Sequence, residues 1–286
     1  MTASFPKKER SGFAVLVMGE ITTVLFAPSN PAFEKSLLSK VELLFDFYEN
    51  RAGKIQKNID NAGFSCTSCG RCCQREDADN SVYLLPKEIE MIEKDTGMHK
   101  RDFILPLFPD FYTGGNGSSV RIETERFTEI VKTIPDQIDE KGCIHTFGWM
   151  LQRDESGRCI FLDDETKKCA IYDVRPGLCR TYPFYLSESG IEECECEGLR
   201  QNSKTDAALS SELSGASIKR VLAEQDDFLR TQQHFETERG RVSFNTEHGI
   251  ENALNDSKAG VLKFVVYDGY GIHHTEIRVS GFKEHK

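Results

Sequence analysis

Four of the ten cysteines lie within eight residues, in the segment Cys66–Cys73. It reads Cys66-Thr-Ser-Cys69-Gly-Arg-Cys72-Cys73, so its thiols are flanked by polar residues and glycine. Buried structural cysteines usually stand singly in apolar runs, whereas this composition is typical of a polar turn. Clustered thiols on such a turn indicate a bound metal ion or an iron–sulfur cluster.

The spacing Cys66-x2-Cys69-x2-Cys72 is the one with which ferredoxin-like loops give three thiolates to one iron–sulfur cluster. Cys73 follows at once. Because adjacent cysteines rarely point at the same metal, either the fourth ligand comes from elsewhere or Cys73 serves a second centre. Zinc is the alternative, since it also takes four thiolates and uses Cys-x2-Cys pairs. Structural zinc sites generally pair two separated knuckles, whereas the later cysteines are dispersed. Iron–sulfur is therefore the first expectation and zinc the second.

Two arginines flank Cys179 in the second dense segment, residues 171–184. Arg175 lies four residues before this cysteine and Arg180 directly follows it. A cluster held by four thiolates carries negative charge, which fixed guanidinium groups would offset, raising its reduction potential. The alternative is that both arginines pair with nearby carboxylates at the surface.

The histidines and a glycine-rich segment could also suggest a functional site, but a structural role is the simpler explanation for both. His145 is the histidine nearest the thiols in sequence, and His273-His274 form a pair on the last expected strand. Structural hydrogen bonding is expected of these histidines rather than metal ligation. The three glycines of residues 109–119 lack the Lys-Ser/Thr pair of a phosphate loop, which predicts an exposed, mobile loop.

These motifs resemble those of the YkgJ-like cysteine-cluster family of zinc- or iron-chelating proteins, over about residues 64–199. The resemblance rests on the following ordered motifs: Cys-x2-Cys-Gly-x-Cys-Cys, Cys159-Ile-Phe-Leu, Cys169-Ala-Ile-Tyr, Arg175-Pro, Cys179-Arg, Tyr182-Pro-Phe and Cys196-Glu-Gly. It implies eight candidate metal ligands: Cys66, Cys69, Cys72, Cys73, Cys159, Cys169, Cys179 and Cys196. Eight thiols suit two four-ligand sites, hence one or two [4Fe-4S] clusters, or zinc. Cys143 and Cys194 lie outside the pattern.

One branch of this family resembles flagellin lysine N-methylase, which implies an enzyme as an alternative. The chain lacks the Cys-x3-Cys-x2-Cys motif of radical S-adenosylmethionine chemistry and a glycine-rich nucleotide loop after a strand. Our leading prediction is therefore a metal-binding protein. Its preferred metal group is an iron–sulfur cluster, and it acts in electron transfer, redox sensing or maturation of a protein partner. A protein-lysine N-methylase-like enzyme and a structural zinc-binding interaction module are the alternatives. Catalytic residues are unknown.

Composition narrows the class of partner and the compartment. The 286 residues carry a net charge of -10, and no basic block extends beyond Lys7-Lys8-Glu9-Arg10. This disfavours nucleic acid and anionic membranes as partners and leaves protein partners open.

The apolar stretch 13–27 superficially resembles a signal peptide, but Glu20 interrupts it and it is too short to span a bilayer. A buried strand pair, or a start at Met18, is expected instead. Clustered cysteines then indicate the reducing cytoplasm.

Hydrophobic periodicity predicts the elements that position the thiols. Helical spacing follows Asn30-Pro31, over residues 33–48, and a second helix is expected from Pro86 to Gly97. Residues 158–172 read as a hairpin whose turn lies between two cysteines, and residues 261–279 as a second hairpin.

The predicted class is α+β, with a cysteine-rich metal-binding core and short hairpins, wrapped by helical and hairpin extensions. A further helix is expected around residues 218–229. The expected divisions are an apolar segment and long helix over residues 1–63, a cysteine-cluster metal-binding domain over 64–199, and a helix plus hairpin extension over 200–286.

Overall fold

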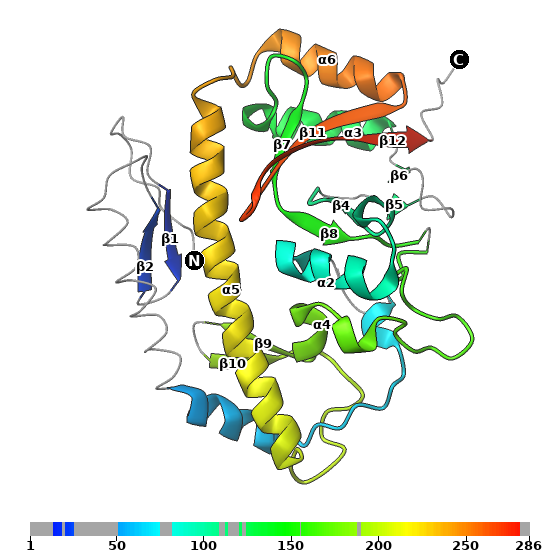
Figure 1. Ribbon diagram of the computed structural model, residues 1–286, viewed down its shortest axis with the longest axis vertical. Coiled ribbons are helices and arrows are strands. Elements are labelled where there is room, and N and C mark those ends of the chain that lie inside the picture. Colours follow the sequence, from blue (N-terminus) through cyan, green and yellow to red (C-terminus); the bar gives the residue numbers. More distant parts are fainter. Residues whose placement is uncertain are drawn as a thin grey trace.

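The computed structural model describes residues 14–18, 21–25, 51–74, 82–108, 112–113, 120–121, 124–154, 156–187 and 190–280. Helices and strands are mixed along this part of the chain, as the α+β class requires (Figure 1). Residues 51–61 are helical, and the other helices are α2 (Pro86–Thr96), α3 (Thr124–Thr133), α4 (Gly177–Thr181), α5 (Ala207–Arg239) and α6 (Glu247–Lys258). None of the described helices combines the length and apolarity needed to cross a membrane.

The described strands form two larger sheets and two hairpins. The five-stranded sheet has the order β5 (Tyr112–Thr113), β6 (Val120–Arg121), β12 (Gly271–Ser280), β11 (Val261–Asp268) and β7 (Ile144–Phe147). The three-stranded sheet has the order β3 (Tyr83–Leu84), β8 (Trp149–Leu151) and β4 (Ile104–Pro106). The hairpins are β1 (Ala14–Met18) with β2 (Ile21–Leu25), and β9 (Phe184–Ser187) with β10 (Gly190–Glu193).

Gly148 joins the two larger sheets. It lies between β7 and β8 with φ 93°, a backbone conformation that favours glycine. A Cβ at this position would lie 2.2 Å from the ring of Tyr83. Its N–H donates to the carbonyl of Tyr267, 2.8 Å away. The pairing of β7 with β11 ends at this residue, and the chain continues into β8 of the other sheet.

The last hairpin is confirmed and belongs to the same sheet as a strand from the cysteine-rich half. β11 and β12 pair antiparallel from Val261–Arg278 to Asp268–Gly271. β7 pairs parallel with β11 at Phe264–Tyr267. Residues 144–147 and 261–280 therefore contribute to one sheet, although they lie in different predicted divisions of the chain.

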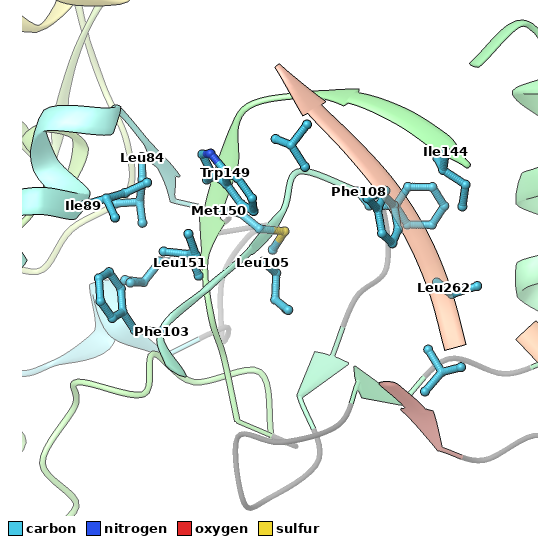
Figure 2. Close-up of a cluster of buried hydrophobic side chains, with 14 of the residues drawn as sticks. Leu84, Ile89, Phe103, Leu105, Phe108, Ile144, Trp149, Met150, Leu151 and Leu262 are labelled. Carbon is cyan, nitrogen blue, oxygen red and sulfur yellow. The ribbon is translucent and has the colours of Figure 1, made fainter. Parts of the chain in front are cut away.

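Two apolar clusters make up the described core. The larger lies between the sheets and α2, α3 and α6, with Trp149, Met150 and Leu151 of β8 near its middle (Figure 2). The smaller joins the helix over residues 51–61 to β9 and α5, through Ile55, Ile59, Ala62, Phe64, Phe184, Leu199 and Leu213. Phe64 and Phe184 meet edge to face, with ring centroids 5.5 Å apart.

The expected cysteine-rich core is not confirmed, because both clusters are built from apolar side chains. Cys159 and Cys169 are only partly buried against the larger cluster, and Cys196 against the smaller one. None of the ten cysteines forms a disulfide. Cys159, Cys169 and Cys196 therefore lie at the edges of the apolar clusters rather than inside them.

Helix α2 begins and ends as predicted. Pro86 occupies its first position, and the Glu88 side chain accepts a hydrogen bond from the Leu85 N–H at 2.9 Å. Gly97 ends the helix in the left-handed conformation, with φ 69°, and its N–H donates to the Glu93 carbonyl.

Helix α5 is much longer than the predicted helix around residues 218–229. Asp206 caps its first turn, since its carboxylate accepts hydrogen bonds from the N–H groups of Ala208 and Leu209. Its buried positions are mostly polar: Ser210, Leu213, Ser214, Ser217, Arg220, Asp227 and Thr231. Apolar periodicity therefore detects only part of it.

The remaining expectations have mixed outcomes. Residues 14–18 and 21–25 form the antiparallel strand pair β1–β2, whereas the predicted helix over residues 33–48 lies outside the described residues. Within 109–119 only Tyr112–Thr113 is described, and it forms strand β5. The predicted strands in residues 158–172 are wrong: the chain reverses there, but through isolated bridges only, Arg153–Cys159 and Leu162–Cys169. Residues Tyr172–Val174 instead form a short 3-10 helix, η4.

Candidate metal centre

Nine of the ten cysteines line one cavity of about 830 Å³. They come from three separate segments of the chain, and comprise all eight candidate ligands and one additional thiol: Cys66, Cys69, Cys72, Cys73, Cys159, Cys169, Cys179, Cys194 and Cys196. Three of these, Cys66, Cys72 and Cys194, are exposed, and the other six are half-buried. The fold thus gathers thiols up to 130 positions apart in sequence on one surface.

The cavity lies between the two apolar clusters. Leu151 and Ile171 of the larger cluster form part of its wall, and so do Phe64, Leu199 and Leu213 of the smaller. A group bound to the thiols that line this cavity would therefore lie next to both clusters.

The loop that carries Cys66–Cys73 turns through two residues in the left-handed conformation. They are Ser68, with φ 56°, and Gly70, with φ 73°. A Cβ at Gly70 would lie 2.8 Å from the carbonyl oxygen of Lys167, so glycine allows the loop to touch the segment that leads to Cys169. The short 3-10 helix η1 (Arg71–Cys73) follows.

The end of this loop is attached to the segment that carries Cys159 and Cys169. The Cys159 N–H donates to the carbonyl of Cys73 at 2.8 Å. Cys159 in turn accepts a backbone hydrogen bond from Leu162, which bridges to Cys169. Backbone hydrogen bonds therefore place Cys73, Cys159 and Cys169 in one neighbourhood.

The start of the loop is attached to the segment that carries Cys196. The Ser65 N–H donates to the Gly198 carbonyl at 2.9 Å, and the Gly198 N–H donates to the Cys196 sulfur at 3.4 Å. A Cβ at Gly198 would lie 2.5 Å from the Ser65 carbonyl oxygen, so this approach requires glycine. Cys66 and Cys196 are therefore held together.

The thiols perturb one another's ionisation. A hydrogen bond with Cys159 and burial raise the pKa of Cys73 to about 12, and burial next to Cys73, Cys72 and Cys169 raises the pKa of Cys179 to about 12. The pKa of Cys72 is raised by its hydrogen bond with Cys73, whose Sγ lies 4.0 Å from its own, and by burial. Such thiols are protonated at neutral pH, so a metal must displace their protons.

Burial raises the pKa of Cys196, and the neighbouring Cys69, Cys72 and Cys66 raise it further. The hydrogen bond from the Gly198 N–H acts in the opposite direction. Cys69, Cys72 and Cys66 are thus the thiols that act on Cys196, whereas Cys73, Cys72 and Cys169 act on Cys179. Cys72 belongs to both neighbourhoods.

The cavity wall is positively charged, although the whole chain has a net charge of -10. Three glutamates, Glu193, Glu195 and Glu197, line it together with twice as many basic residues: Arg71, Lys167, Lys168, Arg175, Arg180 and Arg200. Arg71 pairs with Glu197, and Arg200 pairs with Glu193 at 2.9 Å. The wall therefore retains cations able to offset bound anions.

Arg175 and Arg180 both lie on this wall. Arg180 donates to the Asp173 carbonyl at 2.9 Å, and the Arg175 guanidinium lies 3.8 Å from the centre of the Tyr172 ring. Neither arginine forms an ion pair within 4.0 Å with a carboxylate of the described residues. The expected surface ion pairs are therefore not found among the described residues, and the role of both arginines beside the thiols stays a prediction.

The donor chemistry fits a soft metal, but the thiols are not drawn together into a coordination sphere. Nine sulfurs on one wall are a donor set that selects zinc or iron–sulfur over harder metals. Yet among the described residues no group of three His, Cys, Asp or Glu side chains is arranged to hold a metal ion. Metal binding would therefore require these loops to close on the metal.

The two cysteines outside the family's motif pattern, Cys143 and Cys194, lie in different parts of the structure. Cys194 lines the cavity, next to Glu193 and Glu195, although the motif pattern omits it. Cys143 lies away from the cavity wall, and its N–H donates to Asp139 at 2.8 Å. The spacing Cys194-x-Cys196 was the available signal for the ninth thiol.

His145 is structural, as expected. It is 1% exposed, and its two ring nitrogens contact the Tyr267 hydroxyl at 2.6 Å and the Asp139 carboxylate at 3.2 Å. His273 contacts Asp268 at 3.0 Å. Neither histidine lines the thiol cavity.

Comparison with known proteins agrees with the metal-binding class that the cluster of thiols indicates. Residues 65–197 match the model of the CxxCxxCC family, which is described as a "Putative zinc- or iron-chelating domain". This confirms the family resemblance and supports metal binding in general terms. The matched residues include all the cysteines of the cavity.

The chain is also similar to a protein of Methanocaldococcus jannaschii that is described as uncharacterized. The two are 56% identical over 144 residues, which cover 47% of this chain and 56% of the relative. The chain thus spans about half the length of the relative that it matches. No solved structure matches it.

Proposed function

We propose that this protein binds two metal centres through cysteine thiolates, and that these centres are [4Fe-4S] clusters. We further propose that it acts in the cytoplasm in electron transfer, redox sensing or maturation of a protein partner. The observation that carries this proposal is the single cavity lined by nine thiols and an excess of cations. When bound, such clusters supply one-electron chemistry whose potential depends on charge and hydrogen bonds around the sulfurs.

Two backbone connections, together with the thiols that raise the pKa of Cys196 and of Cys179, support a division of the eight candidate ligands into two sets. The start of the loop is attached to residues 196–198 and its end to residue 159. One centre would then use Cys66, Cys69, Cys72 and Cys196, and the other Cys73, Cys159, Cys169 and Cys179. This division assigns the adjacent Cys72 and Cys73 to different centres.

Charge supports two centres. A divalent metal or a [4Fe-4S]²⁺ core held by four thiolates carries a net charge of about −2. Four cations of the wall make no ion pair with a carboxylate of the described residues: Lys167, Lys168, Arg175 and Arg180. Their combined charge matches two such centres.

A structural zinc module is the second candidate, and the position of the cavity favours it. The thiols line a cavity between two apolar clusters, and a structural metal bound there would cross-link the clusters. This module would present its helices to a partner and would be colourless and redox-silent.

Metal analysis distinguishes the candidates. The protein is purified without exposure to air and assayed for iron, zinc and acid-labile sulfide, with visible and EPR spectra. Iron and sulfide in proportion, at two centres per chain, are expected. Stoichiometric zinc without sulfide would favour the structural module instead, and absence of both metals would contradict metal binding.

A further inference from the structure

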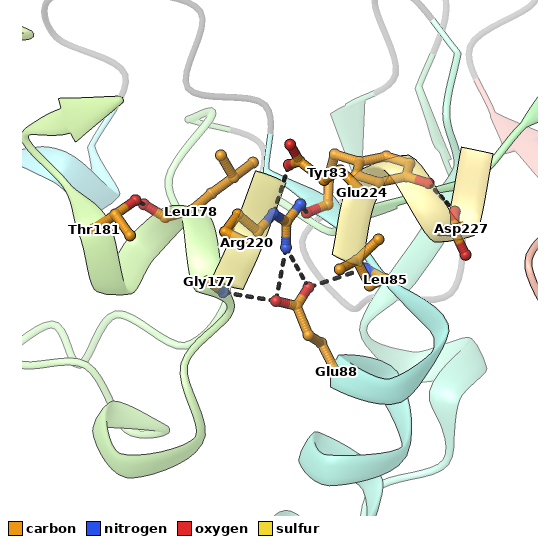
Figure 3. A network of polar contacts seen from close by, with 9 residues as sticks. All are labelled: Tyr83, Leu85, Glu88, Gly177, Leu178, Thr181, Arg220, Glu224 and Asp227. Carbon is orange, nitrogen blue, oxygen red and sulfur yellow. Dashed lines mark hydrogen bonds and ion pairs between the residues drawn. The ribbon is translucent and has the colours of Figure 1, made fainter. Parts of the chain in front are cut away.

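A largely buried ion pair contacts the start of α4, the short helix whose Cys179 lines the thiol cavity. Arg220 of α5 and Glu88 of α2 meet at 2.6 Å, and their side chains are 5% and 15% exposed. Both oxygens of Glu88 accept from Arg220, at 2.6 and 2.7 Å (Figure 3). A pair with this two-oxygen contact and this burial fixes the two helices relative to each other.

The same carboxylate holds the first residue of α4. The Gly177 N–H donates to Glu88 at 2.7 Å (Figure 3). A Cβ at Gly177 would lie 2.8 Å from Arg220 Cδ and 3.0 Å from the carboxylate, so glycine allows the three residues to meet. Cys179 is two residues further along this one-turn helix, and its position depends on where the helix starts.

The remaining hydrogen bonds of Arg220 keep it in place. Its guanidinium also donates to Glu224 at 2.5 Å and to the Tyr83 carbonyl at 3.1 Å. The Tyr83 hydroxyl donates to Asp227 at 2.6 Å, and Asp227 lies about two helical turns beyond Arg220 on α5. The network therefore joins α2, α5 and β3, and α4 is attached to it at one point, Gly177.

We propose that Glu88 and Arg220 are positioning residues that hold Cys179 in place for the centre formed with Cys73, Cys159 and Cys169. This inference rests on the proposed function, since it assigns a role to residues that do not touch the metal. Removing the network should weaken that centre about 10- to 100-fold, as is typical when groups that orient metal ligands are lost. The centre of Cys66, Cys69, Cys72 and Cys196 should keep its affinity.

The test is a titration of the reduced, metal-free full-length chain with Co²⁺ alone, without oxygen, followed by sulfur-to-cobalt charge-transfer absorption in competition with a chelator. Cys179→Ser and Cys196→Ser first identify which Co²⁺ belongs to which centre. Arg220→Met, Glu88→Gln and Gly177→Ala are then compared with wild type. Each should lower affinity for the Cys179 centre and spare the other.

Arg230→Met is the matched control. Arg230 also lies on α5 and pairs with a carboxylate, Asp226, at 2.9 Å, but its side chain is 59% exposed and does not line the cavity. It should bind Co²⁺ as wild type does. If Arg220→Met does not fold by circular dichroism, the milder Gly177→Ala and Glu88→Gln decide.

The outcomes separate the two proposals. If wild type binds no Co²⁺ through sulfur, the proposed function fails. If wild type binds two ions and the folded variants bind both equally well, the positioning role alone is overturned. Equal weakening of both centres would also overturn it, because a general loss of stability would then explain the result.

Discussion

At the scale of single residues, each cysteine of the cavity is defined by its neighbours rather than by its own exposure. Cys66 and Cys72 are exposed, yet they belong to the same wall as the half-buried Cys179. Cys143 is half-buried like several candidate ligands, but the charged groups that act on it are Asp139, Lys263, Lys141 and Asp256, and no thiol is among them. Cys143 is therefore the natural control for substitutions in the cavity.

Cys69→Ser or Cys72→Ser should remove a centre and destabilise the protein, because metal binding is coupled to folding. Metal and sulfide analysis together with thermal unfolding measure both effects. Cys143→Ser should keep full metal content. Cys194→Ser should also keep it if eight thiols suffice; loss of metal in this variant would make the ninth thiol of the wall a ligand.

Arg175→Met and Arg180→Met should leave cluster assembly intact and lower the reduction potential, because a fixed positive charge favours the more negative, reduced state. Potentiometric titration followed by EPR measures the change. Arg230→Met, which removes an exposed arginine away from the cavity, should not change the potential. Unchanged potentials in both cavity variants would contradict the role of these arginines beside the thiols.

At the scale of elements, close backbone approaches decide which segments share a centre. Gly198→Ala would place a methyl group 2.5 Å from the Ser65 carbonyl oxygen and 2.9 Å from the Phe64 ring. The segments that carry Cys66 and Cys196 would then separate. About half of the bound metal should be lost, namely the centre that includes Cys196, while the centre of Cys179 remains.

Gly97→Ala is the matched control for this prediction. The left-handed conformation at the end of α2 should cost about 1–2 kcal/mol with alanine, although a Cβ meets nothing within 4 Å there. Chemical denaturation should show this loss of stability without loss of metal. If Gly198→Ala instead behaved like Gly97→Ala, the assignment of Cys66 and Cys196 to one centre would be wrong.

Helices and strands were predicted correctly where neighbouring residues in the sequence mark their ends or their apolar face. Pro86 and Gly97 gave both ends of α2, and the two final strands alternate around an obvious turn. Most of α5 was missed because it buries serine, arginine and aspartate, which apolar periodicity does not count. The segment 158–172 was mistaken for a hairpin because its Cys-Ile-Phe-Leu and Cys-Ala-Ile-Tyr runs have strand composition.

The sequence indicated which thiols share one cavity, while their role as metal ligands stays a prediction. Eight thiols were named from spacing and family resemblance, and all eight line one cavity. Cys194 was missed because it lies outside the pattern. The Glu88–Arg220 network was also missed, since residues 132 positions apart give no sequence signal for a contact that tertiary packing creates.

At the scale of the whole molecule, the thiol cavity and the rest of the fold are joined by α5, which packs against α4, β9, β11 and β12 (Figure 1). This arrangement fits a metal centre held on a helical and sheet framework. Because the sequence lacks a glycine-rich nucleotide loop after a strand, we predict that the holoprotein cycles between redox states but does not methylate lysine when given S-adenosylmethionine and a lysine-bearing protein. Calorimetry and mass spectrometry test this. Saturable binding with lysine methylation that Cys69→Ser abolishes would favour the methylase.

Removal of the metal should loosen one half of the molecule and spare the other. The proposed centres connect residues 66–73, 159–179 and 196 between the two apolar clusters, whereas β11 and β12 are secured by their own sheet. A ligand present at 1,000 times its dissociation constant stabilises a folded state by about 4 kcal/mol, so the unfolding temperature should fall on chelation.

Hydrogen exchange locates this effect. Under reducing conditions, chelation should speed exchange in residues 64–74 and 156–199 and leave exchange in β11 and β12 little changed, because local opening follows local stability. Cys143→Ser should show the same pattern as wild type. Equal protection of the cysteine loops with and without metal would mean that packing alone holds them, and the proposed cross-link between the clusters would be wrong.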